Sequence, residues 1–258
     1  MMIVEQMLNN AKTPLLHIAD VSGSALFQGD CLDIMPLIPD NSIDCIITDP
    51  PYGTTACKWD SVIDFNLMWE QLNRIIKPNG AIVLFGSEPF SSALRMSNIK
   101  NYKYDWKWEK EKAGNFQLAK KQPMKKQEDI MVFYKKMPTF NPQGLIEINK
   151  VRKNNPTKNG SMGHLQSTQK RKTYVQKYTN YPTEVLKYNN EKGLHESQKP
   201  VPLFEYLIKT YTNEGDLVLD NCMGSGSTMV ACKNTNRKFI GIEKEPKYYE
   251  IACRRCGF

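Results

Sequence analysis

The chain has 258 residues, 40% of them hydrophobic, which is enough for one large domain, or for one domain with a substantial insertion, that buries a full core. No apolar run reaches the length of a membrane span and no signal-peptide pattern opens the chain, so we expect a soluble, cytoplasmic protein. Seven scattered cysteines predict reduced thiols. The one Cys-x-x-Cys pair, Cys253 and Cys256, has no second pair to complete a zinc site.

The net charge of +8 comes from the middle of the chain. Residues 100–190 carry 20 Lys and Arg against 7 Asp and Glu, whereas residues 1–99 carry 5 against 11. A localised basic excess is typical of a surface that binds a polyanion, although a solvated lysine-rich surface has the same composition.

The hydrophobic pattern predicts alternating strands and helices on either side of an irregular middle. Residues 1–23 show no clear period, so we expect a loose N-terminal extension. The β-α-β-α order that follows predicts a parallel, doubly wound sheet. Its strands are expected at 25–28, 43–48, 81–85, 217–220 and 238–243. Its helices are expected at 31–37, 65–76, 88–99, 201–211 and 246–254, with one more that follows the run 224–228 and ends at about 234.

The pattern changes between these two parts. Residues 102–108 alternate and predict a strand, and 129–134 predict an antiparallel partner for it. Between them, 110–126 read as a basic, polar loop. From about 137 to 190 aliphatic residues become scarce, which indicates a small excursion from the core or a partly disordered segment.

A rigid tip follows the strand at 43–48, with the sequence Asp49-Pro50-Pro51-Tyr52. The two prolines cannot continue a sheet ladder, so the strand ends there, at the edge of the sheet where open α/β proteins bind ligands. A carboxylate, two carbonyls and an aromatic ring suit a planar ligand that bears an amino group. The tip offers no obvious nucleophile or metal cage.

A glycine turn, Asp220-Asn-Cys-Met-Gly224-Ser-Gly226-Ser-Thr, joins a strand to a helix near the carboxyl end of the chain. A P-loop would need Lys where Ser227 stands, and a dinucleotide fingerprint would need a third glycine, so both readings are weak. A site for a methionine-sulfonium nucleotide is the third reading. Glu243, at the end of the next strand, is well placed for ribose hydroxyls.

Together with His195-Glu-Ser-Gln-Lys199-Pro200, these motifs resemble the amino-group DNA methyltransferases that use S-adenosylmethionine (AdoMet). Their order resembles the circularly permuted β subclass, whose motifs include Asp-Pro-Pro-Tyr, over roughly residues 24–258. The resemblance implies a Rossmann-like α/β fold with a mixed, mostly parallel seven-stranded sheet and an inserted target-recognition region. Asn221-Cys222 departs from the family's usual Pro-Phe. The implied parts are an N-terminal extension (1–23), a catalytic half (24–136), the target-recognition insertion (137–190) and an AdoMet-binding half (191–258).

The resemblance also implies roles for single residues. Asp49 and the Pro50 carbonyl would accept the two N–H bonds of an adenine amine and free its lone pair for attack on the sulfonium methyl, while Tyr52 stacks on the flipped base. The implied AdoMet contacts are Asp30 (adenine amine), Phe85 (adenine ring), Lys199 (carboxylate end), Asp220, Gly224 and Gly226 (methionine part) and Glu243 (ribose). The implied phosphate contacts are Lys150, Arg152, Lys153, Lys158, Lys170, Arg171, Lys172 and Lys177.

The implied activity is site-specific methylation of adenine N6 in double-stranded DNA, without a metal. Asp rather than Ser before Pro-Pro-Tyr favours adenine over the alternative, cytosine N4. Protein-glutamine methylation usually has Asn in place of Asp49, and a catalytically inactive DNA-binding homologue is a further alternative. By resemblance alone, a homodimer and a separate cognate restriction endonuclease are the other partners to expect.

Overall fold

The computed structural model describes residues 2–12, 14–19, 23–54, 61–153, 173–191 and 198–258. They form two compact units: unit 1 is Met1–Asn141 with Glu184–Phe258, and unit 2 is Pro142–Thr183. Unit 2 is shorter at both ends than the segment 137–190 delimited on sequence. The flanks belong to unit 1 because the Asn141 side chain donates to the carbonyls of Lys209 and Thr212, at 3.1 and 3.0 Å, and because a strand at 185–187 joins the sheet of unit 1.

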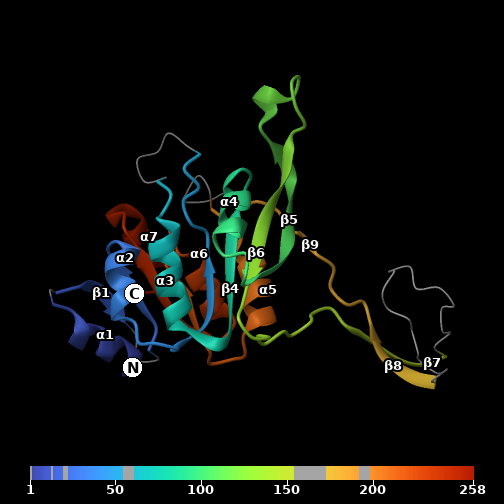
Figure 1. Cartoon of the computed structure of the whole chain (residues 1–258), viewed down its shortest axis with the longest axis horizontal. Helices are drawn as coiled ribbons and strands as arrows, with labels where there is room; N and C mark the ends of the chain where they lie inside the picture. The colour runs from blue at the N-terminus through green and yellow to red at the C-terminus, as the bar shows by residue number, and fades with distance from the viewer. Residues whose placement is uncertain (1, 13, 20–22, 55–60, 154–172, 192–197) are drawn as a thin grey trace. The chain divides into compact units, whose positions relative to one another are not determined.

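Unit 1 contains a nine-stranded sheet in the order β1-β2-β11-β10-β3-β4-β6-β5-β9 (Figure 1). Strands β2, β11, β10, β3 and β4 are parallel, and β6 runs antiparallel between β4 and β5. The predicted mixed, mostly parallel sheet is therefore confirmed, but among the described residues this sheet has nine strands and not seven. The two additional strands are short edge strands, β1 and β9. The bounds are β1 Leu16–Ala19, β2 Ala25–Gln28, β3 Ile43–Thr48, β4 Ile76–Gly86, β5 Tyr102–Gly114, β6 Lys125–Phe133, β9 Val185–Lys187, β10 Leu217–Asp220 and β11 Lys238–Glu243.

Helices cover both faces of this sheet. Strand β3 shows why: Ile46 packs into the core on one face, and Cys45 and Ile47 pack into the core on the other. Strands buried on both faces read as continuous apolar runs, which is typical of parallel sheets. One face carries α1 (Met2–Asn10), α2 (Cys31–Ile34), the 3₁₀ turn η1 (Met35–Leu37), α3 (Phe65–Ile75) and α4 (Phe90–Ser97), and the other carries α5 (Val201–Tyr211), α6 (Ser227–Asn234) and α7 (Pro246–Cys256).

The N-terminal residues are not the loose extension that the sequence predicted. Helix α1 buries Val4 and Met7 against the core, and β1 pairs antiparallel with β2. Two buried side chains on a nine-residue helix are too few to produce a clear apolar period. The order of this segment therefore comes from tertiary packing.

The prediction of a loop at 110–126 was right for 115–124 and wrong at both ends. Strand β5 continues to Gly114 and β6 begins at Lys125, and the connection between them, 115–124, includes η2 (Phe116–Leu118). In the outer part of β5, Glu109-Lys110-Glu111-Lys112 places charged side chains on both faces, so the hydrophobic alternation seen at 102–108 is missing there. The predicted antiparallel pairing of 102–108 with 129–134 is confirmed by the register of β5 on β6.

Unit 2 is an antiparallel hairpin of β7 (Ile146–Lys153) and β8 (Thr173–Thr179). None of its described residues is buried. Its side chains therefore face solvent on both sides of the ribbon, which explains why the sequence showed no apolar pattern there.

Candidate active site

A cavity of about 270 Å³ opens at the carboxyl ends of β3, β10 and β11. The chain leads from β3 to β4 on one side and from β10 to β11 on the other, so the boundary between β3 and β10 is a topological switch point of the kind that binds ligands. The predicted catalytic and cofactor residues that line the cavity are Asp30, Asp49, Pro50, Pro51, Tyr52, Lys199, Asp220, Gly224 and Glu243.

The Asp49 carboxylate receives a hydrogen bond on each oxygen. The Tyr52 hydroxyl donates to Oδ1 and the Lys199 ammonium donates to Oδ2, both at 2.5 Å. Burial and the negative charge of Asp49 raise the pKa of Tyr52 well above its ordinary value, so the phenol stays protonated and keeps donating. The Tyr52 ring stacks on Phe90, with ring centroids 5.0 Å apart, which fixes the direction of the hydroxyl.

Lys199 lies on the catalytic tip and not on the glycine turn, where it was expected to meet the carboxylate end of AdoMet. Only 6% of the residue is exposed, and its ammonium lies between Asp49 and Glu128, at 2.5 and 3.3 Å. Burial by itself would lower the pKa of Lys199, but the two carboxylates raise it above its ordinary value. The lysine therefore carries a full charge, which its two partners balance.

Glu128 is a site residue that sequence reasoning missed. It lies on β6 and pairs with Lys110 of β5 as well as with Lys199. Burial opposes ionisation, yet the two lysines hold the pKa of Glu128 below its ordinary value. Its only sequence signal is a charged start to an apolar strand, because the pairing depends on which strands become neighbours.

Asp220 is buried at the end of β10 and its oxygens are occupied. Thr48 and Thr228 donate to it at 2.7 and 2.6 Å, and the backbone N–H of Cys222 donates at 3.0 Å. Burial raises the pKa of Asp220 to about 6, although these three donors lower it. Asp220 therefore ties β3, β10 and α6 together directly beneath the cavity.

Glu243 supports the glycine turn from the end of β11. Its Oε2 accepts from the Gly224 N–H at 2.8 Å and its Oε1 accepts from the Glu245 N–H at 2.7 Å. Gly224 has a φ of +52°, and a Cβ at this position would meet no atom within 4 Å. The turn thus presents bare backbone to the cavity beside a carboxylate.

Phe85 and Gly226 lie outside the cavity lining. Phe85 is fully buried in the core and packs on Phe204, with ring centroids 5.3 Å apart. Phe204, and not Phe85, lines the cavity. Gly226 has a φ of +81°, and a Cβ there would lie 2.9 Å from the Ala252 Cβ. Its role in this structure is the close packing of α6 on α7.

Asp30 lines the cavity and also caps α2. Its Oδ1 accepts from the Leu32 N–H at 2.9 Å, and its Oδ2 pairs with Lys244 at 3.0 Å. Burial raises the pKa of Asp30, but these partners outweigh it and lower the pKa below its ordinary value. Asp30 is therefore an ionised acceptor at the rim.

Asn221 contributes an unpaired acceptor to the cavity wall. Its Oδ1 is buried without a hydrogen-bond partner among the described residues, which predicts a donor from a ligand. This oxygen, the open space at Gly224 and the carboxylate of Glu243 fit a polar ligand with both amine and hydroxyl groups. Within the described ranges, no three His, Cys, Asp or Glu side chains form a metal-binding group, and no helix is long and apolar enough to span a membrane.

The predicted phosphate contacts divide between described and undescribed residues. Lys150 and Arg152 share one face of the β7–β8 ribbon with Tyr174 and Gln176, whereas Lys153 and Lys177 lie on the other, and all four basic side chains are exposed. Lys158, Lys170, Arg171 and Lys172 lie outside the described residues, as does His195.

Comparisons with known proteins show the family of the chain. The N6/N4 DNA methylase family matches residues 43–254. The type II methyltransferase M.HpaI of Haemophilus parainfluenzae is 31% identical over 251 residues, which is 89% of this chain and 73% of that protein. The DNA adenine methyltransferase YhdJ of Escherichia coli (strain K12) is 29% identical, over 89% of this chain and 81% of that protein.

A solved structure, the M1.HpyAVI complex with S-adenosylmethionine, superposes with a TM-score of 0.60 at 28% identity. The match covers 89% of this chain and 98% of that one. AdoMet is the methyl donor of the family, and the predicted AdoMet-dependent methyltransferase fold is confirmed. The chain belongs to the family of amino-group DNA methyltransferases, which methylate adenine N6 or cytosine N4.

Proposed function

We propose that this protein is a site-specific DNA methyltransferase that modifies the N6 amino group of adenine. The observation that carries the proposal is the Asp49–Tyr52 tip, whose carboxylate has one donor on each oxygen and opens into the same cavity as the glycine turn. Asp in front of Pro-Pro-Tyr favours adenine by family resemblance, and the similarity to an adenine methyltransferase of Escherichia coli supports the same choice.

The tip would activate a conjugated amine through hydrogen bonds alone. A carboxylate has about four acceptor sites, so Asp49 keeps sites for the substrate after binding Tyr52 and Lys199. Asp49 and the Pro50 carbonyl would each accept one N–H of the amine, which draws the nitrogen toward tetrahedral geometry and frees its lone pair. Because Tyr52 and Lys199 hold the carboxylate in place beforehand, little reorganisation accompanies the reaction.

AdoMet supplies an electrophilic methyl group on a sulfonium when it is bound. Gly224 would admit its methionine part, Glu243 would accept from its ribose hydroxyls, and Asp30 would accept from its adenine amine. The unpaired Asn221 oxygen is a further acceptor on this wall. Lys199 pairs with Asp49 and Glu128. We therefore assign Lys199 the role of positioning the tip, and not that of binding the AdoMet carboxylate.

The substrate base would leave the duplex to reach this cavity, since the reacting amine of a paired adenine lies inside the helix. Within unit 2, one ribbon face combines Lys150 and Arg152 with Tyr174 and Gln176, a mixture suited to contacts with phosphates and base edges. We assign target recognition to unit 2 and therefore expect binding to double-stranded DNA that weakens steeply with salt. By analogy with type II relatives, a cognate endonuclease on a separate chain, a homodimer and a cytoplasmic location are part of the proposal.

Single-molecule sequencing of DNA from cells that express the protein tests the proposal. We expect N6-methyladenine in one sequence context, and an Asp49→Ala variant should lose about a hundredfold or more in rate while it still binds AdoMet in calorimetry. N4-methylcytosine without N6-methyladenine would establish the cytosine alternative, because the same acceptors serve either amine. Failure of the wild type to bind AdoMet would identify an inactive DNA-binding homologue.

A further inference from the structure

A two-stranded arm, formed by residues 110–127 of β5, β6 and their connection, extends beyond the rest of the sheet of unit 1 (Figure 1). All residues from 114 to 127 are exposed. At its end, the Phe116 ring is 73% exposed, and Leu118 and Met124 are 39% and 43% exposed. Large apolar side chains held at the end of a solvated ribbon indicate a contact surface.

The arm is strongly basic. Residues 112–126 include five lysines and no acidic residue. Lys126 pairs with Glu109, and Lys125 donates to the Glu88 carbonyl. Within the described ranges, Lys112, Lys120 and Lys121 have no side-chain partner in this structure. Their charges are therefore available to an anionic partner.

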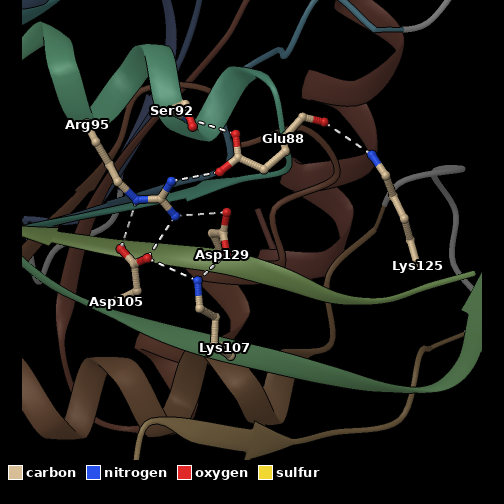
Figure 2. A network of polar contacts seen from close by, with 7 residues as sticks. All are labelled: Glu88, Ser92, Arg95, Asp105, Lys107, Lys125 and Asp129. Carbon is tan, nitrogen blue, oxygen red and sulfur yellow. Dashed lines mark hydrogen bonds and ion pairs between the residues drawn. The ribbon is translucent and has the colours of Figure 1, made fainter. Parts of the chain in front are cut away.

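A network of half-buried ion pairs fixes the base of the arm (Figure 2). Arg95 of α4 contacts Asp105 of β5 at 2.7 Å and Asp129 of β6 at 2.9 Å. Lys107 bridges the same two carboxylates from β5, at 3.1 and 2.6 Å. Because one arginine holds both strands to α4, the direction of the arm is set by the core.

The arm begins at the active site. Lys110, its first residue, pairs with Glu128, and Glu128 lies 3.3 Å from the Lys199 ammonium that binds Asp49. At about 3.4 Å per residue, the five steps from Lys110 to Asn115 extend roughly 17 Å from this point. A polymer whose reacting group occupies the cavity would therefore pass within reach of the arm.

We infer that the arm is a second DNA-binding element, separate from unit 2, which contacts the duplex beside the flipped base. The inference rests on the proposed function. Lys112, Lys120 and Lys121 bind phosphates on either side of that nucleotide, and Phe116 packs against the bases that its departure exposes. DNA fits better than a protein partner because the charged side chains around Phe116, at the end of the arm, are all lysines. The major groove of DNA also admits a two-stranded ribbon.

Binding to a mixed-sequence DNA duplex, measured by fluorescence anisotropy at several salt concentrations, tests the lysines. Lys120→Ala/Lys121→Ala should reduce the slope of log Kd against log salt by about 2, since each lost phosphate contact contributes about 0.9. The matched control is Lys100→Ala/Lys136→Ala, which removes the same charge from exposed positions at the opposite end of the two strands. The control should keep the wild-type slope.

Methyl transfer to the same DNA from labelled AdoMet tests the role of Phe116 at the end of the arm. Phe116→Ala should lower the rate about tenfold, the effect of losing one base–aromatic stack, with AdoMet affinity unchanged. Met137→Ala, a substitution at an apolar side chain that is also 73% exposed, should have no effect.

The outcomes separate this inference from the proposed function. Equal salt slopes for the arm variant and its control would overturn the inference, as would a wild type that binds no duplex. A reduced slope for the arm variant together with a wild type that makes no N6-methyladenine would support the arm and refute the adenine assignment.

Discussion

The buried carboxylate of Asp220 should make the stability of the protein depend on pH in a defined direction. Burial raises its pKa from 3.8 to about 6, so the folded chain binds the proton more tightly than the unfolded chain. The contribution of Asp220 to the unfolding free energy is fully present below the pKa of the unfolded chain, 3.8. It is lost as the pH rises through the pKa of the folded chain, about 6. Above pH 6 the folded protein holds a buried charge at a cost of about 3 kcal/mol, from about 1.36 kcal/mol for each pKa unit.

Asp220→Asn removes this charge and keeps the size of the side chain. The amide oxygen still accepts from Thr48 and from the Cys222 N–H, and the Thr228 hydroxyl rotates to accept from the amide nitrogen. The unfolding free energy of the variant minus that of the wild type should therefore increase with pH. The increase should be about 3 kcal/mol in total, of which about 1.3 kcal/mol falls between pH 5 and 7.

Urea unfolding at pH 5, 6, 7 and 8 measures this difference, with the fluorescence of the buried Trp69, Trp106 and Trp108 as the signal. Taking the difference cancels the other groups that titrate in the same range. Asp33→Asn, at an exposed position on α2, controls for the loss of one surface charge. A difference that stays constant between pH 5 and 7 would refute the reasoning, because it would mean that Asp220 titrates alike in both states.

Three further substitutions test the site. Tyr52→Phe removes the donor to Asp49 Oδ1 and should lower kcat, measured from initial rates, about tenfold or more. AdoMet affinity, measured by calorimetry, should stay the same, and an unchanged kcat would contradict the positioning role. Gly226→Ala places a Cβ 2.9 Å from that of Ala252 and should lower the unfolding free energy by about 1–3 kcal/mol in urea, whereas a neutral effect would rule out the tight helix contact. Arg255→Met removes the donor to the glycine turn and should weaken AdoMet binding about tenfold in calorimetry, and wild-type affinity would show that the turn needs no such support.

The local hydrophobic pattern was sufficient to predict the strands and helices of the AdoMet-binding half. Strands β10 and β11 and helix α5 occupy the residue ranges expected from apolar runs and from Pro200 before the helix. Each is bounded by turn residues and buries its apolar positions, so the information lies within about ten residues of chain. The positions of Asp49 and Asp220 beside one cavity followed for the same reason, since both end parallel strands.

Local pattern failed where order comes from distant partners. Helix α1 and the arm read as unstructured because they bury few side chains and owe their order to neighbours in space. Their sequences lack a hydrophobic period, so nothing local distinguishes them from loops.

The sequence by itself determined the family resemblance, the acceptor tip and the glycine turn, because these are short motifs whose chemistry is written in consecutive residues. Only the tertiary structure decided that Lys199, 150 residues away along the chain, binds Asp49, and that Glu128 joins them from β6. Ion pairs of this kind depend on the order of strands in the sheet. That order is fixed by the burial of both faces of the whole sheet and not by any one segment.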